Sequence, residues 1–317
     1  MTAMNESPHI AVLLPCYNEA AAIAKVVTAF KNALPTATIY VYDNNSTDNT
    51  AEQASLAGAI VRREPHRGKG NVVRRMFSDI EADIYVMADG DETYDPTVAP
   101  ELIRKLTCEH LDMVVGSRVA TETQSFRSGH RFGNRMLTGL VQHLFGYGFE
   151  DMLSGYRIMS RRFVKSFPIH SRGFEIETEM SVHALQLQLP VAELPTKYGV
   201  RPEDSQSKLR TYRDGFRILF TIIGLLTTER PRLFYGLIAL LLTLLSFGLA
   251  TPIFYDYHIT GEVARFPTAF LCLGLVLLAV QVLIFGFLVH SIRRGRIETK
   301  RLAYLGQKGV SQNGAIR

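Results

Sequence analysis

The sequence predicts an α/β fold, a mostly parallel sheet flanked by helices, followed by an amphipathic helix and two C-terminal helices that cross a membrane. Three observations lead to this prediction. Short apolar runs alternate with helical patterns between Ile10 and Gly116, polar residues gather at the ends of those runs, and two long segments near the C-terminus are almost free of charge. The chain of 317 residues, 47% of them hydrophobic, is long enough for one large domain and a smaller addition.

Five apolar runs predict strands at residues 10–14, 38–42, 59–63, 84–88 and 113–115. Between the first two runs, apolar residues recur at helical spacing: Ile23, Val26, Val27, Phe30 and Leu34. Further helices are expected at residues 132–145 and 174–189, and a return to the sheet at 191–200. Because strands and helices alternate, the chemistry is expected at the carboxyl ends of the strands.

Residues 208–228 combine apolar residues at helical spacing with Lys208 and three arginines. Such a basic amphipathic stretch suits a membrane interface, although an ordinary helix packed on the catalytic domain has the same pattern. The predicted domains are therefore a catalytic domain (1–206), a juxtamembrane segment (207–231), two spans (232–292) and a basic tail (293–317). The polar residues after Leu305 are expected to be loosely held.

The two uncharged segments, 233–255 and 266–290, each exceed the roughly 20 residues that a helix needs to cross a bilayer. Arginines precede the first segment and five basic residues follow the second, whereas the loop 256–265 carries a single Arg. The first eight residues are polar and are followed by a short apolar strand instead of the longer apolar run of a signal sequence, so export of the large domain is not expected. This asymmetry predicts a multi-pass protein of the inner (cytoplasmic) membrane with its catalytic domain and both ends in the cytoplasm.

The cysteines and the distribution of charge argue against a disulfide-stabilised, a zinc-binding or a nucleic-acid-binding protein. Cys16, Cys108 and Cys272 form no spaced set, which favours a reducing compartment over a disulfide framework or a zinc site. The formal charge of +5 is explained by the segments next to the lipid bilayer. No basic run interleaved with aromatic residues indicates nucleic-acid binding, so nucleic acid is not expected as a partner.

Two carboxylates flank a glycine after the fourth run, in Asp89-Gly90-Asp91. Alternate residues of a strand project to the same side, and glycine allows a ligand to approach closely. Such a pair suits a hard divalent cation, Mg²⁺ or Mn²⁺, that could bridge a diphosphate. The triplet is also common in solvated turns, so the hypothesis depends on its position after a buried strand.

Motifs follow one another in a distinctive order: Leu14-Pro15-Cys16-Tyr17-Asn18-Glu19, Asp43-Asn44-Asn45-Ser46, Gly68-Lys69-Gly70 and Asp89-Gly90-Asp91. This ordered set resembles the inverting glycosyltransferases of family 2, which have the GT-A fold. Later motifs are similar to the branch of dolichol-phosphate mannose synthases and bacterial polyprenyl-phosphate glycosyltransferases: Gly116-Ser117-Arg118, Arg131 with Asn134, Asp151 before Ser154-Gly155-Tyr156-Arg157, and Arg201 before Ser207-Lys208-Leu209.

The resemblance implies a role for each matching residue. The nucleotide would be bound by Pro15, Tyr17, Glu19, Asp43, Lys69 and Asp89, the metal by Asp89 and Asp91, the diphosphate by Arg118 and Arg131, and the lipid phosphate by Arg201, Ser207 and Lys208. Asp151 would act as a base or would orient Arg157 or the metal, and an ordinary buried ion pair is an equal alternative. Many relatives have Gln where this chain has Thr93, which puts a third protein ligand for the metal in doubt.

The implied reaction transfers one hexose-type sugar from a UDP- or GDP-sugar to a polyprenyl phosphate, undecaprenyl or dolichyl, with inversion at the anomeric carbon. Catalysis would be carried by Asp91, Asp151, Arg118 and Arg131. A phosphate acceptor is already largely deprotonated near neutral pH, so it needs no strong base.

Two alternatives stay open: a transferase acting on a saccharide or protein hydroxyl, which would need Asp151 or another carboxylate as base, and a non-catalytic membrane scaffold of the same fold. A processive polysaccharide synthase is disfavoured because the chain contains no Trp for the Gln-x-x-Arg-Trp pattern of such enzymes. An oxidoreductase is disfavoured because the first strand is followed by no glycine fingerprint. Homo-oligomerisation is left open.

Overall fold

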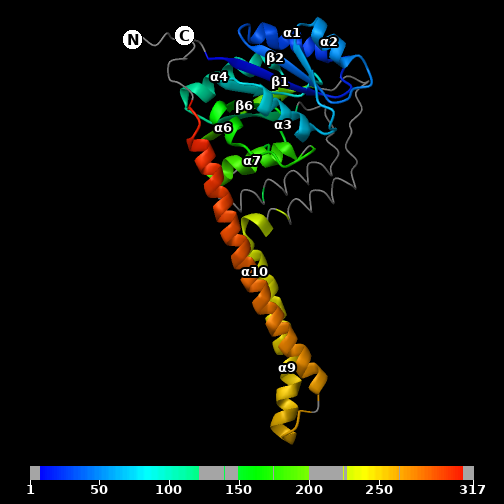
Figure 1. The fold of residues 1–317 in the computed structure, drawn as a ribbon, viewed down its shortest axis with the longest axis vertical. Coiled ribbons are helices and arrows are strands. Elements are labelled where there is room, and N and C mark those ends of the chain that lie inside the picture. Colours follow the sequence, from blue (N-terminus) through cyan, green and yellow to red (C-terminus); the bar gives the residue numbers. More distant parts are fainter. Residues whose placement is uncertain are drawn as a thin grey trace. The chain divides into compact units, whose positions relative to one another are not determined.

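The computed structural model describes residues 8–120, 139, 149–173, 175–199, 224, 227–263 and 265–309 (Figure 1). Two compact units are formed, one by residues 1–211 with 299–317 and the other by residues 212–298. The helix predicted at 132–145 and the amphipathic segment 208–228 lie almost wholly outside the described residues. The same is true of four predicted site residues: Arg131, Arg201, Ser207 and Lys208.

The first unit is built on a seven-stranded sheet with the order β3-β2-β1-β4-β6-β5-β7. Its strands are β1 (Ile10–Cys16), β2 (Thr38–Asp43), β3 (Ile60–Arg63), β4 (Ile84–Met87), β5 (Met113–Ala120), β6 (Arg157–Ser160) and β7 (Val191–Tyr198). Strand β6 runs antiparallel to both of its neighbours, and the other pairings are parallel. The predicted α/β fold with a mostly parallel sheet is confirmed.

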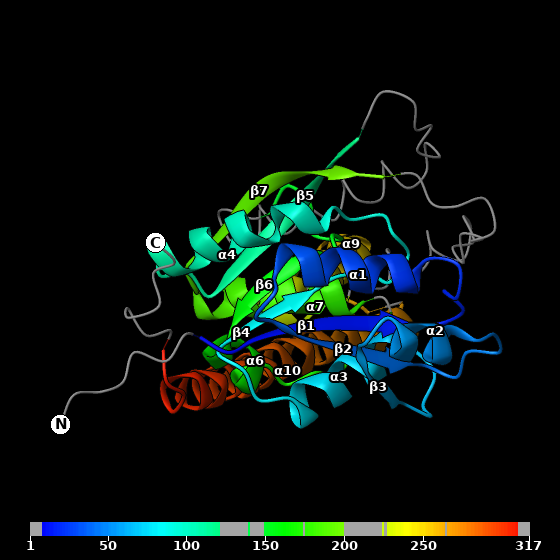
Figure 2. The ribbon, with the colours of Figure 1, turned by 90° about the horizontal axis from the view of Figure 1, so that it is seen from above.

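Helices cover both faces of this sheet (Figure 2). They are α1 (Ile23–Ala33), α2 (Thr50–Leu56), α3 (Lys69–Asp79), the 3-10 turn η1 (Pro96–Val98), α4 (Ala99–Cys108), α6 (Arg161–Ser166) and α7 (Ile176–Leu187). On one face, the buried side chains of α1 and α4 pack with Val12, Val86 and Ile158 into a continuous core. On the other face, α3 and α6 contact each other and the central strands β1, β4 and β6.

The end of the chain returns to the first unit. Helix α10 (Phe266–Leu305) is continuous, and its last turns, from Thr299, belong to this unit. The hydroxyl of Tyr304 donates to Oδ2 of the buried Asp112 at 2.8 Å, and the guanidinium of Arg162 lies 5.0 Å from the Tyr304 ring while it also donates to Asp112. Arg161 donates to Gln307 at 2.8 Å, so the expectation that the residues after Leu305 are loosely held is wrong for Gln307.

Replacing Tyr304 by Phe should reduce the stability of the first unit. A hydrogen bond to a charged group contributes about 1.5 to 3 kcal/mol, and Asp112 would keep its bonds to Ser160 and Arg162. We therefore expect a loss of about 1.5 kcal/mol in the free energy of unfolding, measured by thermal unfolding of the purified protein. Tyr40→Phe, which removes a hydroxyl with no hydrogen-bond partner among the described residues, is the control, and equal effects of the two changes would contradict the prediction.

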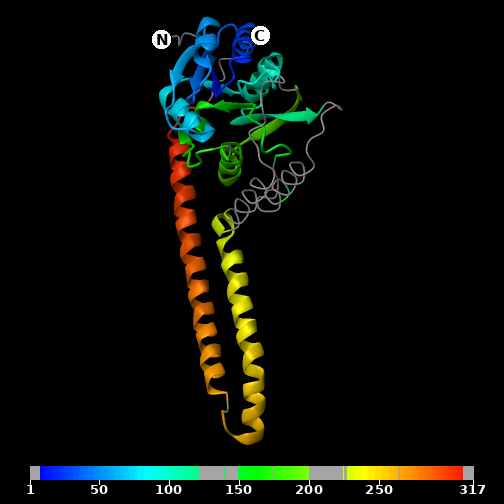
Figure 3. The same ribbon diagram turned by 90° about the vertical axis from the view of Figure 1, so that its right-hand side faces the viewer.

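The second unit contains α9 (Pro231–Thr260) and most of α10, which lie side by side in Figures 1 and 3. Both helices are long and apolar enough to span a membrane by length and composition, which confirms the two predicted spans as helices. Small residues seven apart are buried on both helices: Ala239 and Ser246 on α9, and Cys272, Ala279 and Gly286 on α10. The Ser246 hydroxyl donates to the carbonyl of Cys272 at 2.9 Å. Close packing through small residues with exposed Leu and Phe elsewhere is typical of membrane helices.

Candidate active site

The carboxyl ends of β1, β2, β4 and β5 meet at one edge of the sheet, and the antiparallel β6 begins at that same edge. Strands β1 and β4 are neighbours, whereas β2 and β3 continue on the other side of β1. The order in which successive strands are added to the sheet therefore reverses between β1 and β4, and open α/β sheets bind ligands where this order reverses. The candidate active site is the group of loops at this edge.

The loop after β1 carries two of the predicted nucleotide-binding residues. The guanidinium of Arg67 lies 6.0 Å from the centre of the Tyr17 ring. Asn18 has a positive φ of 55°, which Asn tolerates, and its side-chain oxygen accepts from the backbone N–H of Thr47 at 2.8 Å. The backbone carbonyl of Glu19 accepts from the backbone N–H groups of Ala22 and Ile23, so the start of α1 is fixed next to the loop.

The loop after β2 is also held by its own side chains. The carboxylate of Asp43 is buried and accepts from the backbone N–H of Ser46 at 3.2 and 3.4 Å. Asn44 accepts from the backbone N–H of Gly68 at 2.7 Å, which links this loop to the start of α3. Pro15 is half-buried near the end of β1. These contacts form a prefolded surface on which a nucleotide could lie.

Strand β4 ends at Met87, so Asp89 and Asp91 lie in the turn beyond it, where strand alternation no longer applies. The side chain of Asp89 is 27% exposed, whereas Asp91 is only 2% exposed. Oδ1 of Asp91 accepts from the hydroxyl of Thr93 at 2.5 Å and from its backbone N–H at 3.3 Å. Thr93 therefore fixes the orientation of the Asp91 carboxylate.

Gly90 between the two carboxylates packs on the side chain of Cys16. A Cβ atom at this position would lie 2.5 Å from the Cys16 sulfur, which leaves no space for a larger residue. Burial raises the pKa of the Cys16 thiol, and the nearby carboxylates of Glu19 and Asp89 raise it further. Cys16 is therefore a neutral packing residue and has no nucleophilic role here.

Lys69 is the first residue of α3 and is buried between two carboxylates. Its ammonium lies 2.5 Å from Oδ1 of Asp89 and 2.5 Å from Oε1 of Glu177 on α7. Burial alone would lower the pKa of Lys69, but Asp89 and Glu177 outweigh that effect and raise it. The amine therefore stays charged, and it fixes the position of Asp89.

The glycines around Lys69 serve close packing. Gly68 has a φ of 121°, and a Cβ atom on Gly68 or Gly70 would lie within 2.3 Å of the backbone oxygen of Arg172 or Ser171. These glycines therefore pack tightly against the loop that contains Ser171 and Arg172. Lys69 consequently reaches inward, toward Asp89.

Arg118, near the end of β5, forms a bidentate ion pair with Asp151. Its Nε donates to Oδ2 at 2.7 Å and its Nη2 donates to Oδ1 at 2.8 Å, while the backbone N–H of Arg118 donates to Oδ2 at 3.2 Å. Burial would raise the pKa of Asp151, but the bonds from Arg118 outweigh it and hold that pKa below its usual range. The guanidinium lies 5.5 Å from the ring of Tyr198, and its Nη1 edge is not used by Asp151.

Arg157, the arginine that Asp151 was predicted to orient, is fully buried at the start of β6. Its Nε and Nη2 donate to the backbone carbonyls of Ser154 and Met152. Burial lowers the pKa of Arg157 to about 10. It organises the loop that precedes β6, and it is Arg118 that holds the Asp151 carboxylate.

Sequence reasoning missed two acidic residues that support the site. Glu177 binds Lys69, and Glu193 on β7 accepts from the backbone N–H groups of Glu150 and Asp151 at 2.7 and 3.2 Å. Both belong to segments that were predicted as helix or strand. An acidic residue within a mostly apolar element was the available signal, because such a residue is rarely buried without a partner.

The turn after β4 fits a hard divalent cation. Asp89 and Asp91 would supply carboxylate oxygens, and Gly155 approaches so closely that a Cβ atom there would lie 3.0 Å from Oδ2 of Asp89. Within the part of the chain that the structure describes, no group of three His, Cys, Asp or Glu side chains could hold a metal ion. An ion bound here would complete its coordination with water and donor oxygens, as Mg²⁺ commonly does.

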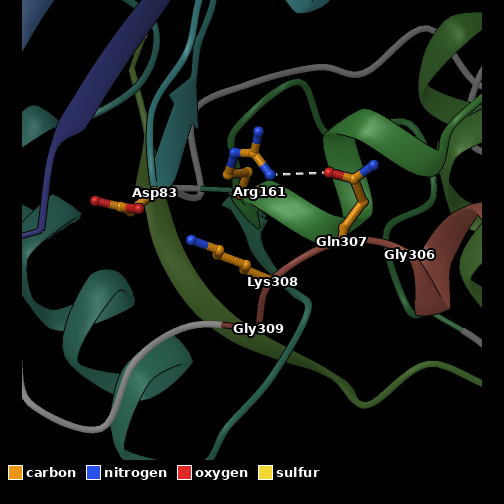
Figure 4. Close-up of a pocket in the computed structure, with 6 residues that line it drawn as sticks. All are labelled: Asp83, Arg161, Gly306, Gln307, Lys308 and Gly309. Carbon is orange, nitrogen blue, oxygen red and sulfur yellow. Dashed lines mark hydrogen bonds between the residues drawn. The ribbon is translucent and has the colours of Figure 1, made fainter.

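A cavity of about 510 Å³ lies at the other edge of the sheet, far from these loops. It is lined by Asp83, Arg161, Gly306, Gln307, Lys308 and Gly309 (Figure 4). Asp83 precedes β4 and Arg161 follows the antiparallel β6, so the cavity lies at the edge opposite the candidate site. It contains none of the predicted site residues.

Comparison with known proteins gives consistent results. The family model described as glycosyl transferase family 2 matches residues 11–167. Glycosyltransferase AglJ of Haloferax volcanii is 34% identical over 297 residues, which cover 91% of this chain and 97% of that protein. Dolichyl-phosphate hexose transferase of the same organism is 25% identical over 224 residues, covering 71% of this chain and 96% of that protein.

A solved structure shares the fold of the first unit. Glucosyl-3-phosphoglycerate synthase from Mycobacterium tuberculosis, in complex with Mn²⁺, UDP and phosphoglyceric acid, has a TM-score of 0.57 at 23% identity. The likeness covers 70% of this chain and 78% of that one. It shows a GT-A type of fold here.

Proposed function

This chain belongs to glycosyl transferase family 2, and from that premise we propose that it transfers one hexose-type sugar from a UDP- or GDP-sugar to a polyprenyl phosphate. Transfer would proceed with inversion at the anomeric carbon. The acceptor, undecaprenyl or dolichyl phosphate, would enter from the bilayer that the two apolar helices of the chain could span.

The pairing of Asp151 with Arg118 is the main observation that favours a phosphate acceptor over a hydroxyl acceptor. A sugar or protein hydroxyl must lose its proton during attack, so it would need a free carboxylate as base. Both oxygens of Asp151 accept bonds from Arg118, and the pKa of Asp151 lies below its usual range, which makes it a weak base. A phosphate acceptor is already anionic and needs no such base.

Two further observations support a lipid acceptor. One relative carries the name dolichyl-phosphate hexose transferase and matches 71% of this chain. The two helices of the second unit expose apolar side chains along their length, as expected for residues that face lipid. A lipid-linked substrate would then share the membrane with the enzyme that uses it.

The metal is proposed to be Mg²⁺ or Mn²⁺, held by Asp89 and Asp91 together with the donor diphosphate. When bound, it would neutralise the charge that develops on the departing nucleoside diphosphate. The protein itself would orient Asp89 through Lys69 and Asp91 through Thr93. Preorganised ligands of this kind favour the transition state because no reorganisation is needed at the moment of reaction.

The proposed step is an in-line displacement. A phosphate oxygen of the lipid forms a bond to the anomeric carbon, while the bond from that carbon to the diphosphate oxygen breaks. Tyr17, Glu19 and Asp43 would hold the nucleotide against the loops after β1 and β2, with Pro15 beside them. Arg118 and Arg131 would bind the diphosphate, since guanidinium forks match phosphate oxygens. Arg201, Ser207 and Lys208 would bind the lipid phosphate.

A donor screen tests this function. Purified full-length protein would be incubated with Mn²⁺ or Mg²⁺, short polyprenyl phosphate and each of several UDP- and GDP-sugars, and the lipid product would be identified by mass. We expect one hexose added to the lipid phosphate. Transfer to a free saccharide in a parallel reaction without lipid, with no lipid product, would instead favour the hydroxyl acceptor.

The orientation in the membrane is a separate prediction. We expect the loop around Thr260 to lie outside the cytoplasm, because basic residues flank the spans on the other side. A Thr260→Cys variant should react with an impermeant thiol reagent in intact cells. Cys108, which is exposed on α4, is the internal control and should react only after lysis. Labelling of Cys108 but not of position 260 in intact cells would contradict an inner-membrane protein with a cytoplasmic catalytic domain.

A further inference from the structure

We propose that Glu177 is a positioning residue for the cation site: through Lys69 it fixes Asp89, and its charge offsets the ammonium next to that carboxylate. The inference rests on the metal site of the proposed function and adds a residue that belongs to none of the family motifs in the sequence.

The geometry forms a chain of three charged groups. The ammonium of Lys69 lies 2.5 Å from Asp89 on one side and 2.5 Å from Glu177 on the other. The side chains of Lys69 and Glu177 are only 9% and 5% exposed, whereas that of Asp89 is 27% exposed. Glu177 is thus the most buried of the three charged groups, and Asp89 is the one that a ligand can reach.

Each group comes from a different element. Lys69 begins α3, Asp89 follows β4, and Glu177 lies in the first turn of α7. An ammonium has three donors, so Lys69 can bind both carboxylates at once and tie these elements together. Gly155 closes the cluster, because a Cβ atom there would lie 3.2 Å from the Lys69 nitrogen. Asp89 is therefore fixed before any ligand arrives.

The balance of charge explains why an acidic residue is needed at position 177. A lysine alone would neutralise Asp89 and would weaken its attraction for a cation. With Glu177 present, the two carboxylates and the one ammonium have a formal charge of −1, so Asp89 keeps its attraction for a cation. Without the charge of Glu177 the same three groups have a formal charge of zero.

Glu177→Gln is the informative variant because glutamine has nearly the same shape and still accepts a hydrogen bond from Lys69. The measured quantity is the Mn²⁺ concentration that gives half-maximal binding of UDP, or of GDP if UDP does not bind, determined by calorimetry on the full-length protein. Loss of a residue that supports metal ligands typically weakens metal affinity about ten- to a hundredfold. We expect a rise of that size for Glu177→Gln.

Two other variants test whether the lost charge causes the expected rise in the Mn²⁺ requirement. Glu177→Asp keeps the charge and should stay near the unmodified protein. The double variant Lys69→Met with Glu177→Gln removes one charge of each sign and returns the formal charge of these three groups to −1, so it should need less Mn²⁺ than Glu177→Gln alone. Because it buries no unpaired charge, it also keeps the test usable if the single variant does not fold.

Glu109→Gln is the matched control. It makes the same chemical change in an exposed residue just after α4, before β5 begins at the opposite edge of the sheet. It should leave the Mn²⁺ requirement unchanged.

Three outcomes would overturn the inference. They are an unchanged Mn²⁺ requirement in Glu177→Gln and an equal loss in Glu177→Asp, which overturn the inference as a whole, and an equal loss in the double variant, which overturns the role given to the charge of Glu177. The readout contains no acceptor and no sugar transfer, so an error about the lipid acceptor would not affect it. If Mn²⁺ had no effect on nucleotide binding by the unmodified protein, the proposed metal site itself would be wrong.

Discussion

Replacing Asp91 by Asn should lower the rate of sugar transfer by at least about a hundredfold, because an anionic ligand of the proposed metal would become neutral. Asn keeps the oxygen that accepts from Thr93 at 2.5 Å, and Asp91 is only 2% exposed, so the turn after β4 should keep its shape. The effect should therefore appear in turnover and in the Mn²⁺ requirement, with little change in the melting temperature.

Asp83→Asn is the matched control for this variant. Asp83 lies just before β4, at the other end of the same strand, where it accepts from the backbone N–H of His9 at 2.9 Å. The same chemical change there should leave transfer unaffected. Full activity of the unmodified protein in the presence of a chelator would contradict the prediction, whatever the two variants do.

Much of the fold could be predicted because its signals are local. The strands and the helix α1 follow from apolar runs and helical spacing, and the two spans follow from length and hydropathy. Strand β6 was not predicted, since Arg157–Ser160 is short, entirely buried and shows no alternation. Its position between β4 and β5 depends on pairing between residues that are distant in the sequence, for example Tyr85 with Met159.

The same distinction between predictable and unpredictable features applies to the candidate site. Its location at the carboxyl ends of the strands followed from the alternation of elements, and the family resemblance supplied roles for its motifs. The ion pairs within the site could not be predicted from the sequence. Lys69 and Glu177 are more than a hundred positions apart in the sequence, and Asp151 could have paired with Arg157 close by instead of with Arg118. Such choices depend on tertiary packing, because a buried charge must find a partner wherever the fold brings one.

Replacing Arg118 by Ala should weaken binding of the nucleotide sugar by about ten- to a hundredfold, because a charge-assisted bond to phosphate contributes roughly 1.5 to 3 kcal/mol. The measurement is calorimetry without lipid. The variant has a second effect, since it leaves the buried Asp151 without its partner. The double variant Arg118→Ala with Asp151→Asn removes that unpaired charge.

The double variant separates two roles of Arg118. If Arg118 only holds Asp151 in place, removing both charges should restore donor binding. If the Nη1 edge of the guanidinium contacts the diphosphate, the double variant should bind the donor as weakly as Arg118→Ala does, and this second result is the one we expect.

Arg201→Ala gives the opposite pattern if the two phosphate groups are bound at separate sites. Arg201 lies outside the described residues, so its proposed contact with the lipid phosphate depends on the family motif. We expect its loss to raise the concentration of polyprenyl phosphate needed for half-maximal transfer, with donor binding nearly unchanged. If Arg201→Ala abolished donor binding and left the lipid requirement intact, Arg201 would belong to the diphosphate site. The lipid phosphate would then have to be bound by Ser207, Lys208 or another basic residue near the membrane.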